Sequence, residues 1–157
     1  MPVIRLETRI AAPKARVFDL SRSIDLHKIS TEHTNEEAVA GVTAGLIGEH
    51  ESVTWRARHF GIYQTLTSKI TAFQRPEYFV DEMVQGIFKR FKHEHIFKEE
   101  SGKTLMIDVF DYESPLGILG KIADWLFLQR YMEGLLEKRN ETIKAFAESD
   151  RWREVLS

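Results

Sequence analysis

The stretch Phe88–Pro115, FKRFKHEHIFKEESGKTLMIDVFDYESP, predicts two antiparallel strands and the end of a β-sheet. Ser101 and Gly102 form a two-residue turn signal between two runs rich in β-branched and aromatic residues. This turn places Glu100 opposite Lys103 and fixes the pairing along both strands. Pro115 then fits the first position of a helix, with Ser114 as its N-cap.

The residues after this hairpin predict one long helix, over about 116–148, because apolar side chains recur there at spacings of three and four. Upstream, residues 3–10 alternate as a half-buried strand, and two short helices are expected between Pro13 and Lys28. Turn signals divide the rest into strands. The order predicts an α+β fold in which a curved antiparallel sheet of about seven strands wraps round the long terminal helix. A sheet cannot close tightly on a helix everywhere, so we expect a cavity between them.

Composition restricts the class of protein. The chain has 157 residues, which fits a single domain over 1–157. A net charge of −2 argues against nucleic-acid binding. The sequence holds no cysteine and no signal or membrane-spanning segment, so we expect a cytoplasmic protein without stable membrane insertion. The charged run EKRNE at Glu137–Glu141 predicts a solvated helix face.

Three segments carry a resemblance to a known family. IAAPKARVFDLSRSIDLHKIS (Ile10–Ser30), the strand-rich region Val53–Phe97 and GKTLMIDVFDYESPLGILGKIADWLF (Gly102–Phe127) resemble the START-like or SRPBCC superfamily, in particular one bacterial branch of it. This superfamily has the helix-grip fold and includes polyketide cyclase/dehydrase and lipid-transport proteins. The resemblance implies a deep, mostly apolar cavity under the terminal helix, but no single reaction.

Strand alternation indicates which side chains face this cavity. Across the Ser101–Gly102 turn His95 lies opposite Asp108 and His93 opposite Phe110, and a second hairpin turns at Phe60–Gly61. The expected ligand-binding residues are Trp55, His59, Gln64, Leu66, Phe91, His93, Phe97, Met106, Phe110, Trp125 and Leu128. The strand YFVDEMV leaves open whether Asp81 or Glu82 points inward.

Two chemical interpretations of the histidines compete with simple ligand recognition. His93, His95 and Glu99 resemble part of a cupin metal motif, but Gly86 is one residue off its spacing and the second motif is absent, so we expect no metal and no cofactor. The catalytic candidates are His95 and Asp108, because a carboxylate opposite an imidazole can orient the ring and favour its protonation.

The leading hypothesis is a binder of a hydrophobic small molecule such as a lipid, isoprenoid or polyketide-like compound. The alternative is an enzyme, a cyclase or dehydratase that uses the His95–Asp108 pair. A third hypothesis is a protein-interaction module, which predicts an exposed apolar patch along the terminal helix. The sequence names neither the ligand nor a protein partner.

Overall fold

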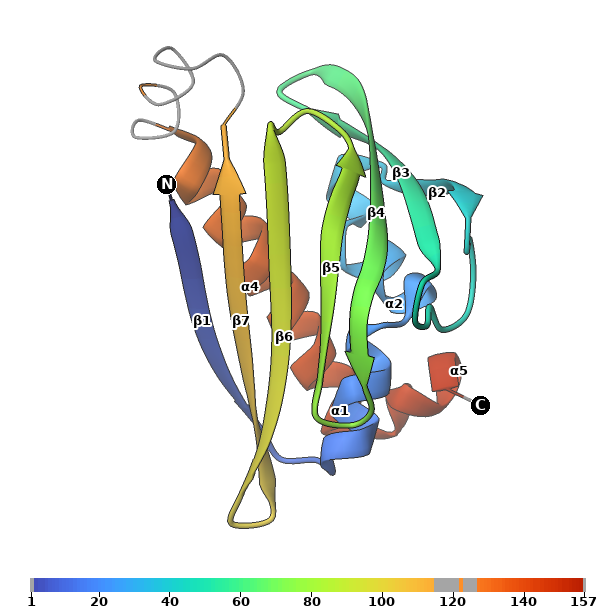
Figure 1. The fold of residues 1–157 in the computed structure, drawn as a ribbon. Helices are drawn as coiled ribbons and strands as arrows, with labels where there is room; N and C mark the ends of the chain where they lie inside the picture. The colour runs from blue at the N-terminus through green and yellow to red at the C-terminus, as the bar shows by residue number, and fades with distance from the viewer. Residues whose placement is uncertain (1, 115–121, 123–126, 157) are drawn as a thin grey trace.

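In the computed structural model, one antiparallel sheet curves around a long helix (Figure 1). The structure describes residues 2–114, 122 and 127–156. Within these residues the sheet has seven strands in the order β1-β7-β6-β5-β4-β3-β2. The strands are β1 (Val3–Ile10), β2 (Glu37–Gly41), β3 (Ser52–His59), β4 (Ile62–Gln74), β5 (Tyr78–Gln85), β6 (Arg90–Glu100) and β7 (Lys103–Glu113).

The helices lie together on one side of the sheet (Figure 1). They are α1 (Lys14–Ser21), α2 (Ile24–Ser30), η1 (Glu32–Thr34), α4 (Gln129–Ala147), η3 (Asp150–Trp152) and α5 (Arg153–Leu156). Ser23 caps α2 by accepting a hydrogen bond from the Leu26 amide at 3.1 Å. The predicted α+β helix-grip fold, with two short helices after the first strand and a long C-terminal helix, is confirmed. The predicted start of that helix near Pro115 lies outside the described residues.

Both predicted hairpin registers are confirmed. In the β6–β7 pair His95 lies opposite Asp108 and His93 opposite Phe110, and in the β3–β4 pair His59 lies opposite Ile62. Each turn puts two residues in the left-handed region, with φ of 52° and 78° at Phe60–Gly61 and 50° and 80° at Ser101–Gly102. Glycine tolerates this backbone without a steric penalty, so the turn chemistry fixed the register.

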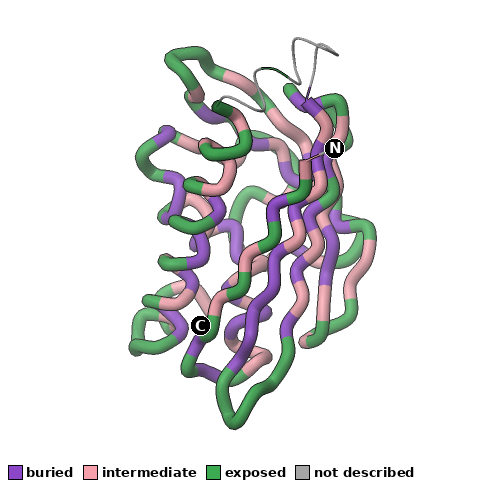
Figure 2. Tube along the Cα trace, turned by 90° about the vertical axis from the view of Figure 1, so that its left-hand side faces the viewer, coloured by how far each residue is buried: buried purple, intermediate pink, exposed green. Residues whose placement is uncertain are grey.

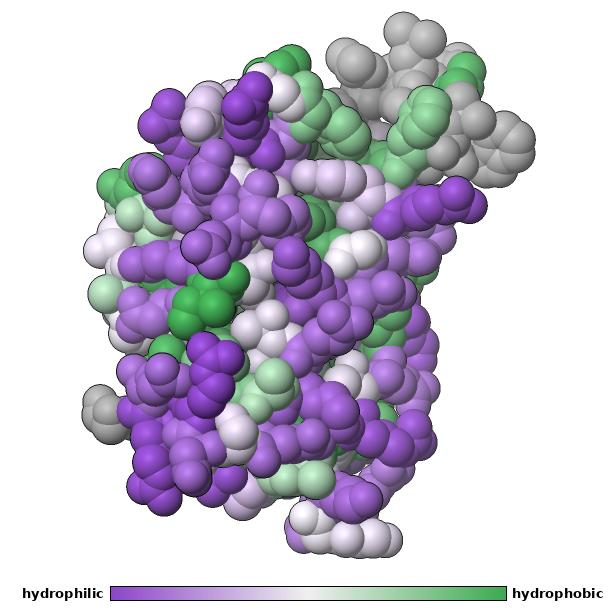
Figure 3. Space-filling model, turned by 180° about the vertical axis from the view of Figure 1, so that it is seen from behind, coloured by the Kyte–Doolittle hydropathy of each residue, from purple (hydrophilic) through white to green (hydrophobic). Residues whose placement is uncertain are grey.

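The buried side chains form two clusters. Figure 2 shows the helices and the sheet as two layers, with buried segments in both. In the larger cluster the ring of Phe18 on α1 makes edge contacts with Phe73, Phe79 and Phe97 at centroid distances of 5.2 to 5.4 Å. The smaller cluster surrounds Phe110. Seen from the helix side, the surface is largely hydrophilic (Figure 3).

Among the described residues, no helix is both long and apolar enough to cross a membrane. The exposed residues of α4 are mostly polar and include Gln129, Arg130, Glu137 and Lys138. The described residues of α4 therefore carry no apolar patch, whereas Ile122 and Phe127, which lie before α4 in the predicted range of the terminal helix, are 52% and 66% exposed, so the third hypothesis stays a prediction.

Candidate functional site

A cavity of about 430 Å³ lies between the concave face of the sheet and helices α2 and α4. Most of its wall is apolar and aromatic. Its volume falls in the range of small-molecule sites. Of the residues predicted to bind ligand, those in the wall are Trp55, His59, Gln64, Leu66, Phe91, His93, Phe110 and Leu128.

Three predicted ligand-binding residues are placed elsewhere or not described. Phe97 and Met106 belong to the core beneath α1 and do not line the cavity. The cause is α1 itself, which packs on this end of the sheet: Phe18 contacts the Phe97 ring at 5.2 Å, and the Ser21 hydroxyl lies 3.4 Å from the Met106 sulfur. Trp125 lies outside the described residues.

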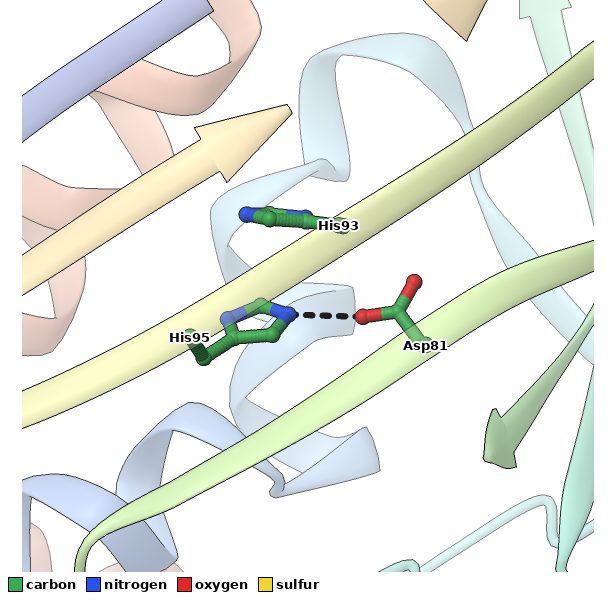
Figure 4. A group of neighbouring side chains, drawn as sticks. All are labelled: Asp81, His93 and His95. Atoms are coloured by element: carbon green, nitrogen blue, oxygen red, sulfur yellow. Dashed lines mark hydrogen bonds and ion pairs between the residues drawn. The ribbon is translucent and has the colours of Figure 1, made fainter. Parts of the chain in front are cut away.

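The polar part of the wall centres on His93 and His95 of β6. Their rings stack at a centroid distance of 3.8 Å, and Asp81 of β5 lies beside them (Figure 4). His95 Nε2 is 2.6 Å from Asp81 Oδ2. The open question about strand β5 is settled in favour of Asp81, which lines the cavity, whereas Glu82 does not.

Asp108 of β7 lies behind the two rings and is 0% exposed. It accepts hydrogen bonds from His93 Nε2 at 2.8 Å, from Asn140 Nδ2 at 2.8 Å and from Arg139 Nη1 at 3.3 Å. Burial opposes ionisation, but the Arg139 charge and the hydrogen bond from His93 hold the pKa of the Asp108 carboxyl well below its usual range. Asp108 is therefore an ionised, fully partnered group.

The predicted pair of His95 and Asp108 is replaced by two others in the structure, since each residue makes its short histidine–carboxylate contact with a different partner. Although the two residues face each other in the ladder, His95 Nδ1 is 3.5 Å from Asp108 Oδ1, and His93 makes the short contact to that oxygen. Arg139 of α4 also contacts His95, with Nη2 at 3.2 Å from Nδ1. The carboxylate partner of His95 is therefore Asp81 on the other neighbouring strand.

The Arg139 contact indicates the tautomer of His95. A guanidinium only donates hydrogen bonds, so in this contact His95 Nδ1 accepts and the proton on Nε2 is donated to Asp81. His93 donates its own Nε2 proton to Asp108. Burial and the neighbouring His95 lower the pKa of His93 to about 4, so this ring is neutral at pH 7.

Arg139 and Asn140 correct the prediction of a solvated face at Glu137–Glu141. They are only 7% and 3% exposed and hold the buried Asp108. Within that run, the neighbouring Glu137, Lys138 and Glu141 are exposed, as predicted. Sequence reasoning missed Arg139 and Asn140 because their partner is on a strand more than 30 positions away, although their helical spacing from Ile143 and Leu136 was a usable signal.

Asp81, His93 and His95 could offer one ligand atom each to a metal, since these atoms lie within 4.8 Å of one another. The hydrogen bonds oppose this use. To bind a cation through Nε2, His95 would have to carry its proton on Nδ1, where the Arg139 guanidinium already donates. Glu99, the third residue of the cupin-like spacing, is exposed near the hairpin turn. The arrangement therefore suits hydrogen bonding to a ligand better than metal coordination.

A second polar contact joins the tip of the β3–β4 hairpin to α4. His59 Nδ1 lies 2.6 Å from the Tyr131 hydroxyl, and the Phe60 ring packs on Tyr131 at 4.6 Å. All three line the cavity, and Phe60 is 67% exposed, so the contact lies where the cavity meets the surface. Tyr131 was not among the predicted residues. We refer to His59, Phe60 and Tyr131 as the rim contact.

Comparison with solved structures supports the fold. The chain resembles TTHA0849 from Thermus thermophilus, with 22% identity, a TM-score of 0.71 and coverage of 92% of this chain and 98% of that one. It also resembles ginseng major latex-like protein 151 from Panax ginseng (14%, TM-score 0.68, coverage 94% and 98%). A third match is the di-domain ARO/CYC StfQ from the steffimycin biosynthetic pathway (14%, TM-score 0.71, coverage 93% and 51%).

No family model and no curated protein matches the sequence. The likenesses are therefore likenesses of fold, and this fold agrees with the helix-grip arrangement that the sequence predicted.

Proposed function

We propose that this protein binds a hydrophobic small molecule in the cavity under α4 and orients the polar end of that molecule with Asp81 and His93. The observation that carries the proposal is an apolar cavity of about 430 Å³ with a pre-formed polar cluster in its wall. Apolar walls supply affinity by burying ligand surface, and a few fixed polar groups supply orientation.

The structural neighbours support the same class of function. One of them is the di-domain ARO/CYC StfQ from the steffimycin biosynthetic pathway, so the same fold is used by a protein of a biosynthetic pathway. In the present chain the polar cluster is rigid because each buried member has a partner on another element. Arg139, for example, connects α4 to Asp108, to His95 and to the Ser21 carbonyl. A cluster held in this way needs no rearrangement to receive a ligand.

Native mass spectrometry of gently purified protein tests the proposal. We expect an organic adduct that is lost on denaturation. Ala57→Phe should remove it, because Ala57 is buried in the cavity wall and a phenyl ring there occupies the space of the ligand. The matched control is Arg58→Phe, which adds the same ring at the next, exposed position of β3 and should keep the adduct. Equal occupancy in both variants would contradict binding in this cavity.

A second candidate, catalysis by a cyclase or dehydratase, is favoured by one observation: a carboxylate oxygen faces an apolar cavity. Asp81 Oδ2 accepts from His95, and Oδ1 has no hydrogen-bond partner among the described residues. Both nitrogens of His95 are engaged, so a base in this site would be Asp81, with His95 as its positioning residue. Asp81→Asn would then abolish turnover while the ligand remained bound. Unchanged turnover would exclude Asp81 as the base.

A further inference from the structure

The two hydrogen-bonding atoms of the Asp81, His93 and His95 cluster that remain free toward the cavity are acceptors. Asp81 Oδ1 and His93 Nδ1 have no partner within the described part of the chain, and His93 uses its single proton on Asp108. Gln64 Oε1 is buried and also lacks a partner. An unpaired buried acceptor is costly, so a ligand that supplies a donor would be stabilised here.

The positive groups in the described cavity wall are already occupied. Arg139 donates to Asp108, Asn140, His95 and a backbone carbonyl. Arg22 donates to Asp19 at 2.9 Å and to the Ile47 carbonyl at 3.1 Å. Each guanidinium thus already has a carboxylate partner, Asp108 for Arg139 and Asp19 for Arg22, which disfavours its use for a ligand carboxylate or phosphate.

The cluster brings two carboxylates together with one guanidinium. Asp81 and Asp108 are ionised, Arg139 supplies a positive charge that contacts Asp108, and the His93 ring is neutral at pH 7. Burial raises the pKa of Asp81, but the hydrogen bond from His95 and the nearby charges, that of Arg139 included, together outweigh it and the pKa is lowered. The other acidic residue in the described wall, Glu36, is paired with His27 at 2.7 Å. The free oxygen of the ionised Asp81 would repel an anionic ligand group placed beside it and attract a cationic one.

We infer that the cavity selects a hydrophobic compound whose polar end donates hydrogen bonds, a protonated amine or a hydroxyl, and discriminates against compounds that end in a carboxylate. This inference rests on the proposed function, which it makes more specific. Asp81 Oδ1 points away from His95 and is the group that would accept from the ligand (Figure 4).

Three probes with one chain length test the inference: decylamine, decan-1-ol and decanoate, each titrated into the protein at pH 7 by isothermal calorimetry. We expect decylamine to bind at least about tenfold more tightly than decanoate, with decan-1-ol between them, since a hydrogen bond to a charged group is worth that factor or more. Asp81→Asn should bring the three affinities together, because it removes the charge and adds a donor. The control Leu66→Ala should weaken all three by a similar factor, since Leu66 lines the apolar wall.

The outcomes separate the inference from the function on which it rests. If all three probes bind equally, or decanoate binds most tightly, the cavity binds ligands but the inferred selectivity is wrong. If none of them binds, the proposed function falls and the inference with it. The order of affinities in the unmodified protein decides between these outcomes even if Asp81→Asn does not fold.

Discussion

At the scale of single residues, His93 connects the site to stability. Burial and the neighbouring His95 lower its pKa from an ordinary 6.5 to about 4, so between these values the unfolded chain binds a proton that the folded protein excludes. Stability therefore rises with pH across this window and is lost as pH falls from 6.5 toward 4. The carboxylates of Asp81 and Asp108 have lowered pKa values, so the stability that they contribute is lost mainly below their ordinary pKa of 3.8, outside this window.

We expect the free energy of unfolding to fall by roughly 2 to 3 kcal/mol between pH 7 and pH 4.5, most of it from His93. Burial also lowers the pKa of His59, which adds a smaller loss with the same sign. In His93→Gln, which keeps a donor for Asp108, most of this pH dependence should disappear. Urea denaturation at several pH values measures it. The control His50→Gln, at an exposed position, should retain the full dependence. A slope that persists in His93→Gln would contradict the assignment.

At the scale of elements, the rim contact joins the β3–β4 hairpin to α4 across the edge of the cavity. In Tyr131→Phe the hydroxyl that contacts His59 is lost, while the aromatic packing on Phe60 can remain. We expect dissociation of decan-1-ol to become about three- to tenfold faster, since one hydrogen bond of ordinary strength would no longer hold the two elements together. Stopped-flow displacement measures this rate.

The control for this prediction is Tyr63→Phe, which removes a hydroxyl from the exposed face of the same hairpin and should leave the rate unchanged. Equal rates in the unmodified protein and in Tyr131→Phe would mean that the ligand leaves by another route.

The strand pairings also show which inward-facing residues could be predicted from the sequence and why others could not. Two hairpins with two-residue turns gave their register directly, so the inward positions of His59, His93 and His95 followed from alternation. The β4–β5 pair could not be aligned, because the register shifts between Thr67 and Ser68 and again between Ile70 and Ala72. An irregularity of this kind leaves no simple pattern of alternation, and for that reason the inward position of Asp81 stayed open.

At the scale of the whole molecule, the site depends on a helix and a sheet that are distant in sequence. The fold class was predictable from the order of elements, whereas the pairing of Asp108 with His93, Arg139 and Asn140 arises only when α4 lies across β6 and β7. Alternation also predicted Phe97 and Met106 as cavity wall, since it identifies the inner face of a strand but not whether a helix or a cavity covers it.

Because the cavity belongs to the folded state alone, ligand binding should stabilise the whole molecule by mass action. At a free concentration of decan-1-ol ten times its Kd, we expect the free energy of unfolding to rise by about 1.4 kcal/mol, with a Tm that increases with probe concentration. Scanning calorimetry measures the shift. Ala57→Phe, whose added ring occupies the cavity, should show none, whereas Arg58→Phe should respond like the unmodified protein. A shift of equal size in Ala57→Phe would place the bound alcohol elsewhere on the surface, and the link between cavity and function would then be lost.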